Sequence, residues 1–109
     1  MIKVMILLKK KPGFTDDEFI EYWNKKHGPL AVKMLPGVRK YIQNHLIKMP
    51  GVKYEADGIA ELWFDDMDAF QKFMEWRETD AAKELREDEE RYLDRSKLVR
   101  FIVEEHEMK

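Results

Sequence analysis

The chain has 109 residues, of which 44% are apolar and 39% are charged, and it contains no cysteine. This length suits one small domain with a single core and a well-hydrated surface, and the lack of cysteine excludes disulfides, thiolate nucleophiles and cysteine-bound metals. The net charge of −2 arises from 22 acidic and 20 basic residues spread along the chain, which argues against a nucleic-acid-binding surface. No stretch approaches the ~20 apolar residues of a membrane span. We therefore expect a cytoplasmic protein with one domain over residues 1–109 and no nucleic-acid or membrane partner.

The first third of the chain predicts a strand followed by a helix. Residues 2–9 form an apolar run that is typical of a strand. Thr15 and Glu18 have the spacing of a capping box, which satisfies free N–H groups at the start of a helix. Gly28 and Pro29 are expected to end this helix, Gly by adopting left-handed backbone angles and Pro because it cannot continue a helix. One face of the helix carries Phe19, Tyr22, Trp23 and His27.

The rest of the chain predicts three more strands and a second helical region. Residues 38–47 and 57–65 alternate between two faces as strands do, and residues 97–105 repeat this pattern. Residues 67–93 show helical spacing with a break near Thr79. The order β-α-β-β-α-β predicts an α+β protein with the ferredoxin-like fold, a four-stranded antiparallel sheet with helices on one face.

The face of this sheet that the helices leave open is predicted to be largely apolar. The third strand is expected to turn Ala60, Leu62 and Phe64 towards the helices, so that Ile59 and Trp63 point the other way, joined by alternate residues of the last strand. An open apolar face normally marks an interface. We therefore expect a homodimer in which two sheets meet face to face and close a barrel, a dimeric α+β barrel. The polar groups expected in a small-molecule cavity between the two sheets are Tyr41, Gln43, His45 and Glu61.

Four segments, in this order, resemble the EthD family of dimeric α+β barrel proteins: EFIEYWNKKHGPLA, YIQNH, DGIAELWFDD and DRSKLVRFIVEEH. The resemblance covers nearly the whole chain, and its more specific parts are the HGP after the helix and the downstream Tyr-x-Gln-x-His. The residues that match as motif members are His27, Gly28, Pro29, Tyr41, Gln43, His45, Asp57, Glu61, Trp63, Asp94 and Ser96.

The resemblance implies one EthD-like domain over residues 1–109, the barrel fold and the dimer. EthD itself is associated with alkyl-ether degradation in an undefined role. Relatives in the superfamily include methylmuconolactone isomerases, polyketide cyclases and decarboxylases, and small cofactor-independent monooxygenases. The substrate does not follow from the resemblance, because one fold hosts many activities.

His27, His45 and Glu61 are the predicted catalytic residues. A histidine at a helix C-terminus, as expected for His27, favours the protonated ring and suits donation to a carbonyl oxygen, although a capping or core histidine is the alternative. A neutral His45 on the cavity face would abstract a proton next to a carbonyl, or it would merely close the end of a strand. Glu61 in an apolar cavity would have a raised pKa and act as a base, or it would pair with Arg39 or His45.

Aromatic and amide side chains near these residues are predicted to contact the substrate: Tyr22, Trp23, Tyr41, Gln43 and Trp63. Histidine and carboxylate are good metal ligands, but no short ligand spacing joins them in this sequence. We therefore predict no metal and no cofactor.

Two kinds of function are consistent with these residues. The first is a cofactor-independent enzyme acting on an aromatic, lactone or polyketide-like carbonyl compound as an isomerase, cyclase or lyase, through an enolate that histidine stabilises. Cofactor-independent monooxygenase chemistry is a variant of it. The second is a non-catalytic dimeric protein that binds a small ligand or serves an accessory role.

Overall fold

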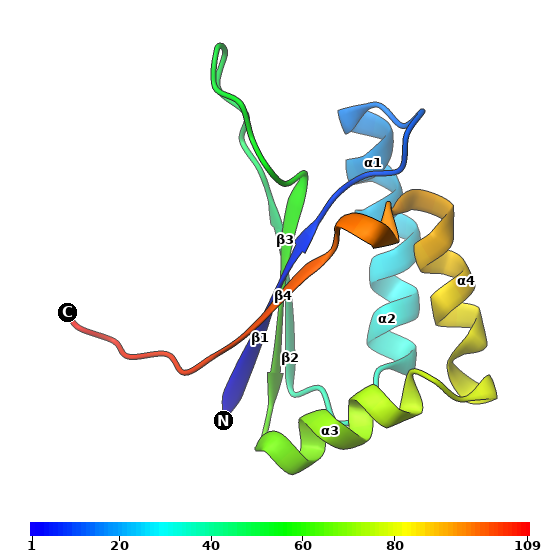
Figure 1. The fold of residues 1–109 in the computed structure, drawn as a ribbon, viewed down its shortest axis with the longest axis vertical. Coiled ribbons are helices and arrows are strands. Elements are labelled where there is room, and N and C mark those ends of the chain that lie inside the picture. The colour runs from blue at the N-terminus through cyan, green and yellow to red at the C-terminus, as the bar shows by residue number, and fades with distance from the viewer.

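The protein folds into two layers, a four-stranded sheet and a layer of helices that covers one of its faces (Figure 1). The computed structural model describes all residues from 1 to 109. In chain order the elements are β1 (Ile2–Leu8), α1 (Asp16–Tyr22), a π-helical turn (Trp23–His27), α2 (Gly28–Met34), β2 (Lys40–His45), β3 (Gly58–Phe64), α3 (Met67–Trp76), a 3-10 turn (Asp80–Ala82), α4 (Lys83–Tyr92), a second 3-10 turn (Arg95–Lys97) and β4 (Val99–Val103).

The strands form one antiparallel sheet in the order β2-β3-β1-β4. The connections from β1 to β2 and from β3 to β4 carry the helices, and β1 and β3 lie side by side at the centre. This is the ferredoxin-like arrangement that the order of elements predicts. Each predicted strand agrees with the observed one to within two residues at either end.

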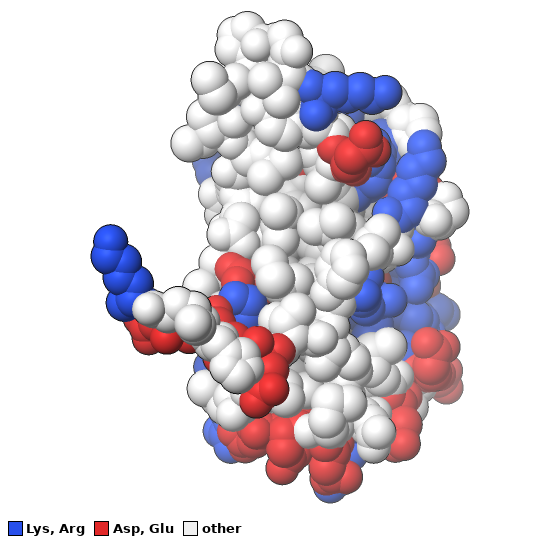
Figure 2. Space-filling view, turned by 60° about the vertical axis from the view of Figure 1, so that its left-hand side comes forward, with Lys and Arg blue, Asp and Glu red and all other residues white.

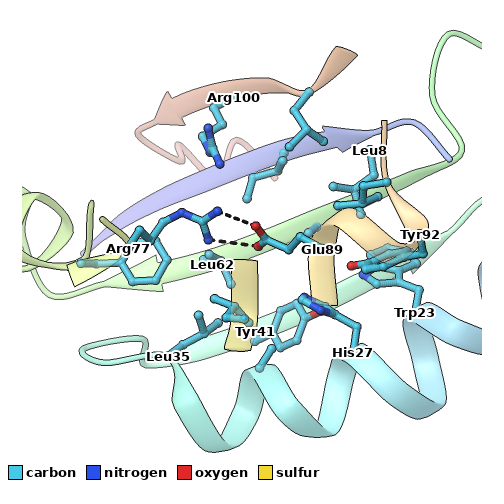
Figure 3. Close-up of a pocket in the computed structure, with 17 residues that line it drawn as sticks. Leu8, Trp23, His27, Leu35, Tyr41, Leu62, Arg77, Glu89, Tyr92 and Arg100 are labelled. Atoms are coloured by element: carbon cyan, nitrogen blue, oxygen red, sulfur yellow. Dashed lines mark hydrogen bonds and ion pairs between the residues drawn. The ribbon is translucent and has the colours of Figure 1, made fainter. Parts of the chain in front are cut away.

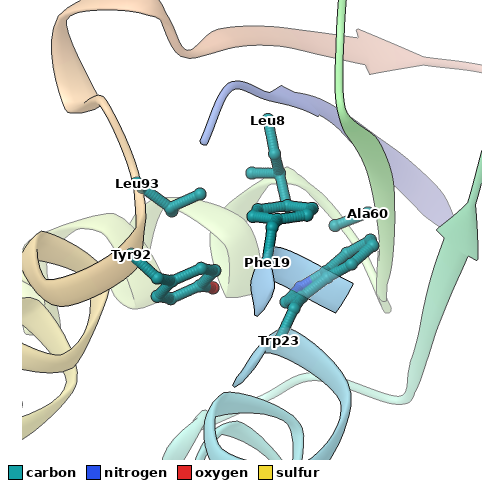
Figure 4. Packing of buried hydrophobic residues seen from close by; sticks show 6 residues of the cluster. All are labelled: Leu8, Phe19, Trp23, Ala60, Tyr92 and Leu93. Carbon is teal, nitrogen blue, oxygen red and sulfur yellow. The ribbon is translucent and has the colours of Figure 1, made fainter. Parts of the chain in front are cut away.

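Two clusters of apolar side chains fill the space between the sheet and the helices. Together they form the core that holds the two layers against each other. The first cluster contains Leu8, Phe19, Trp23, Ala60, Tyr92 and Leu93 (Figure 4). The second contains Val4, Leu62, Phe64, Phe70 and Phe73.

The first helix begins at the predicted capping box. Thr15 Oγ1 accepts a hydrogen bond from the Glu18 N–H (3.1 Å), and Glu18 Oε1 accepts one from the Thr15 N–H (2.9 Å). Both partners of the box are therefore satisfied, and three acidic residues in the first turn favour the helix N-terminus electrostatically.

The helix does not end at Gly28 and Pro29, so this prediction is wrong. Gly28 keeps right-handed helical angles, with φ −53° and ψ −55°, and its N–H donates to the Trp23 carbonyl five residues earlier. Pro29 lies in the first turn of α2, where its missing N–H needs no acceptor. The helix therefore runs on through a π turn, a feature frequent at functional sites, and His27 lies inside it instead of at its end.

The strand β2 faces the opposite way from the prediction. Tyr41 lies opposite Leu62 and Gln43 lies opposite Ala60, and directly opposed residues of an antiparallel pair share a face. Because Ala60 and Leu62 are buried under the helices as expected, Tyr41, Gln43 and His45 also face the helices. Each side of this strand carries both polar and apolar residues, so the sequence pattern did not indicate which side the helices cover.

The open face of the sheet is largely apolar, as predicted, and in Figure 2 most of it is white, the colour of residues other than Lys, Arg, Asp and Glu. Ile59 and Trp63 lie on it, and Val99 and Phe101 of β4 join them through their pairing with β1. Phe101 is 48% exposed. None of the helices is both long and apolar enough to span a membrane.

Candidate functional site

A cavity lies between the helices and the sheet, where the two apolar clusters meet (Figure 3). Its volume is about 50 Å³, several times the roughly 10–15 Å³ that one water molecule needs. Most of its wall is apolar, and a ligand of several atoms has to widen it. The polar residues at its wall are His27, Tyr41, Arg77, Glu89, Tyr92 and Arg100. The composition of this wall, mostly apolar with a few polar groups, is that of a small-molecule site, although the closed cavity is smaller than the roughly 300–1,000 Å³ of such sites.

His27 reaches this cavity from the π turn and is held by a buried carboxylate. Its Nδ1 lies 2.9 Å from Oδ2 of Asp88 in α4, and because a carboxylate only accepts, Nδ1 carries the hydrogen. The other oxygen of Asp88 accepts from the Tyr22 hydroxyl (2.6 Å) and from Arg91 Nη1 (3.2 Å). The second ring nitrogen of His27, Nε2, has no hydrogen-bonding partner in the protein. A neutral His27 therefore presents a free lone pair at the cavity wall.

Gln43 fixes the direction of the hydrogen bonds around Tyr41. Its Oε1 accepts from His45 Nε2 (2.9 Å), and its Nε2 donates to the Trp23 carbonyl (2.9 Å) and to the Tyr41 hydroxyl oxygen (2.8 Å). Both amide hydrogens of Gln43 are thus used, so Tyr41 accepts here and its own hydroxyl hydrogen stays available to a ligand. Burial raises the pKa of Tyr41 and outweighs the hydrogen bonds from Gln43 and Trp23, so the hydroxyl keeps its hydrogen at neutral pH.

His45 does not share an enclosed space with His27. Its ring stacks on the Trp23 indole, with ring centroids 4.9 Å apart, and it lines an open groove together with Tyr41, Gln43 and Gly28. Tyr41 lines both the groove and the cavity. The two histidines therefore border different spaces, and Tyr41 is the residue that the two spaces share.

Glu61 lies on the open face of the sheet, opposite to the face that carries Tyr41 and Gln43, so it does not border the cavity that His27 lines. Its Oε1 lies 2.6 Å from Lys3 Nζ and its Oε2 accepts from Asn44 Nδ2 (2.9 Å). It pairs with neither Arg39 nor His45. The hydrogen bonds from Asn44 and Lys3 lower the pKa of Glu61, whereas the sequence led us to expect a raised one. The carboxylate is a fixed anion within the open face.

Of the predicted substrate-contacting aromatic residues, Trp23 lines the cavity and two others do not. Trp63 lies on the open face, with the Lys3 and Lys40 ammonium groups 5.0 and 4.8 Å from its ring centre. Tyr22 donates to Asp88, and burial, with the help of that carboxylate, raises the pKa of Tyr22. Tyr22 therefore supports the partner of His27 and does not form part of the cavity wall. No three His, Asp or Glu side chains gather into a group that would hold a metal ion.

The sequence analysis missed the contribution of α4 to the site, because its run of charges is typical of a solvated helix face. A signal was nevertheless present. Two apolar residues and two acidic residues recur at positions i, i+3, i+4 and i+7, which places them on one helix face. All of them are buried in the structure: Leu85, Asp88, Glu89 and Tyr92. Acidic residues within such a stripe indicate buried carboxylates with specific partners.

Two of these residues complete the polar wall. Glu89 forms a bidentate, buried ion pair with Arg77, at 3.0 and 2.6 Å. Tyr92 is buried with its hydroxyl unpaired in the protein, and burial raises its pKa well above the usual value. The cavity therefore has two protonated tyrosine hydroxyls and one free imidazole nitrogen.

The fold and the cavity define a ferredoxin-like α+β protein with a small, mostly apolar hollow between sheet and helices. Residues 11–96 match the family model for the EthD domain. The chain belongs to the EthD family, as the four sequence segments indicated.

Solved structures share this fold over the whole chain. An ethyl tert-butyl ether D family protein from Bacillus halodurans is 24% identical, with a TM-score of 0.68 over 97% of this chain and 100% of its own. A protein from Arabidopsis thaliana is 16% identical, with a TM-score of 0.69 over 100% and 99% of the two chains. A dimeric protein of unknown function and ferredoxin-like fold from Bacteroides fragilis is 17% identical, with a TM-score of 0.56 over 94% and 91%. No curated protein matches the sequence.

Proposed function

We propose that the protein is a cofactor-independent enzyme that moves a proton on a carbon next to a carbonyl group in a small, largely apolar ring compound, such as an aromatic, lactone or polyketide-like substrate. The observation that carries this proposal is His27, with Nδ1 bound to the buried Asp88 and Nε2 free at the wall of an apolar cavity. A histidine fixed in this way is suited to general acid–base catalysis.

The proposed reaction uses His27, Asp88 and Tyr41. Nε2 of His27 takes the proton from the carbon, the electron pair of that C–H bond forms a C=C bond to the carbonyl carbon, and the π pair of the C=O bond moves to the oxygen to form an enolate. The Asp88 carboxylate stabilises the imidazolium that forms, and the Tyr41 hydroxyl donates to the enolate oxygen. His27 then returns the proton to another carbon of the enolate, which completes an isomerisation. Cyclisation and decarboxylation pass through the same kind of enolate.

We also propose that the protein is a homodimer built through the open face of the sheet. Lys3, Asn44 and Glu61 of that face form a connected network, so covering the face leaves none of these three without a partner. The dimeric relative from Bacteroides fragilis has the same fold. This arrangement leaves the cavity on the outer, helix side of each sheet.

Exchange with heavy water tests the proposed chemistry. The hydrogens next to the carbonyl of 4-acetylbenzoate, its neutral amide 4-acetylbenzamide and small cyclic ketones would be followed by proton NMR in D2O. We expect saturable exchange with the wild-type protein and a loss of about a hundredfold or more in His27→Gln. Asp88→Asn should lose about tenfold or more, because a charge-assisted hydrogen bond to the imidazolium disappears.

His45→Gln is the matched control, since His45 lies outside the cavity and its replacement keeps a hydrogen-bond donor next to Gln43. If His27→Gln exchanged these hydrogens as fast as the wild type, the proposed chemistry would be wrong. Tight binding without exchange in any variant would instead favour the second function, a non-catalytic binding protein.

A further inference from the structure

Arg100 lies at the rim of the cavity on the edge strand β4. It is paired with Ile6 of β1, whose neighbours Val4 and Leu8 are buried under the helices, so Arg100 is on the helix side of the sheet. Its side chain lines the cavity, and it remains exposed on its outer side. Figure 3 shows Arg100 approaching from β4, across the cavity from His27 and Trp23.

Arg100 is the one arginine of the chain that makes no hydrogen bond or ion pair. Arg39 is bound to Asp65, and Arg86 donates to backbone carbonyls. Each of the other three is paired with a carboxylate of α4: Arg77, Arg91 and Arg95. The guanidinium of Arg100 is therefore free to pair with a ligand that enters the cavity.

The surroundings of Arg100 favour an anion. Burial of its inner side and repulsion from Arg77 lower the pKa of Arg100, yet an arginine remains charged in any protein. The carboxylate of Glu89 is occupied by both nitrogens of Arg77. The rim of the cavity therefore has an uncompensated positive charge.

We propose that Arg100 binds a carboxylate of the substrate, so that the ligand is a carbonyl compound with an acid group at the end opposite the reacting carbon. The reacting end of this ligand follows from the proposed function. The acid group is inferred from Arg100 alone and does not depend on the proposed function. A planar guanidinium binds a carboxylate through two parallel hydrogen bonds, which would also orient the carbonyl towards Tyr41 and His27.

The register of the sheet fits a ligand of one ring. Gln43, Ala60, Ile6 and Arg100 lie in one row across the four strands. Three strand spacings separate the ends of this row, about 14 Å between backbones. Arg100 lines the cavity at one end of this row and Tyr41, in the next row, lines it near the other end, so a single substituted ring that widens the cavity would reach both side chains.

Binding of two matched probes tests this assignment. 4-Acetylbenzoate and 4-acetylbenzamide differ only in the charge of the group para to the acetyl, and isothermal titration calorimetry at low salt gives a Kd for each. We expect the acid to bind the wild type about tenfold tighter or more. Arg100→Gln should remove this preference and leave the Kd of the amide unchanged. Arg95→Gln removes a nearby surface charge as the control and should change the Kd of the acid about threefold at most.

Three results would overturn the assignment. These are equal affinity of the wild type for the two probes, no binding of either, and an unchanged Kd of the acid in Arg100→Gln. Exchange of the acetyl hydrogens separates this question from the proposed chemistry. If Arg100 selects the acid but His27→Gln exchanges normally, the acid site stands and the enzyme mechanism falls. If His27 is needed for exchange but Arg100 does not select the acid, the mechanism stands and the substrate class is wrong.

Discussion

Gln43 is the residue on which the arrangement of hydrogen bonds beside the cavity depends. As an amide it donates to Tyr41 and accepts from His45, and a carboxylate at this position could only accept. Gln43→Glu should therefore reverse the hydrogen bond, so that the Tyr41 hydroxyl donates to the new carboxylate and no longer to a ligand. We expect proton exchange of 4-acetylbenzoate to fall by about tenfold, as for loss of one donor to an enolate oxygen.

Gln43→Glu in a Tyr41→Phe background tests whether Gln43 affects proton exchange through the Tyr41 hydroxyl. If Gln43 acts through the tyrosine hydroxyl, adding Gln43→Glu to Tyr41→Phe should change the exchange rate little, because the donor is already missing. Multiplicative losses in the double variant would show that Gln43 affects the reaction by another route, and the orientation of Tyr41 would then not depend on it.

At the scale of elements, the strand β3 and the first helix pack closely because of Gly58. A Cβ at this position would lie 2.6 Å from Cζ3 and 3.0 Å from Cη2 of the Trp23 indole, and that ring also packs against Phe19 and His45. We expect Gly58→Ala to lower the free energy of unfolding by about 1–3 kcal/mol, measured by urea denaturation. Gly28→Ala is the milder comparison, since its Cβ would meet Gln43 Nε2 at 3.1 Å. Equal stability of Gly58→Ala and the wild type would contradict this packing.

The elements were predictable from the sequence where one local signal determined them. The capping box fixed the start of α1, and the burial alternation of β3 fixed its face, because Ala60, Leu62 and Phe64 form an unbroken apolar side. The π turn was not predictable, since the Gly28-Pro29 pair is typical of a helix end, whereas in the structure the Trp23 carbonyl accepts from the Gly28 N–H and from Gln43 Nε2. The side of β2 that faces the helices was not predictable either, because both sides of this strand carry polar and apolar residues.

The residues of the site were also predictable only where the signal is local in the sequence. His27, Tyr41 and Trp23 were predicted as site residues of a protein with a cavity between two sheets, and in the structure all three line a cavity between the sheet and the helices. The partner of His27 is 61 residues away in the chain. No pattern in the sequence relates Asp88 to that histidine, and only the packing of α4 on the first helix brings them together.

At the scale of the whole molecule, the open face predicts association. We expect the wild-type protein to sediment as a species with twice the mass of one chain, which is 13.2 kDa. Phe101 and Ile102 offer a matched pair, because they are 48% and 50% exposed but point to opposite faces of β4. Phe101→Asp should shift the protein to monomers by placing a charge in the buried interface, whereas Ile102→Asp should stay dimeric. Analytical ultracentrifugation at micromolar concentration measures both, and a monomeric wild type would refute the proposed interface.

The central claim is that the ligand binds on the helix side of the sheet, within reach of His27. A crystal structure of the protein with 4-acetylbenzoate tests it most directly. We expect the ring between the helices and the sheet, the acetyl oxygen within hydrogen-bonding distance of the Tyr41 hydroxyl, the methyl carbon next to His27 Nε2 and the carboxylate on Arg100. A ligand seated on the open face of the sheet, or in the outer groove beside His45, would contradict the account and leave His27 a structural residue.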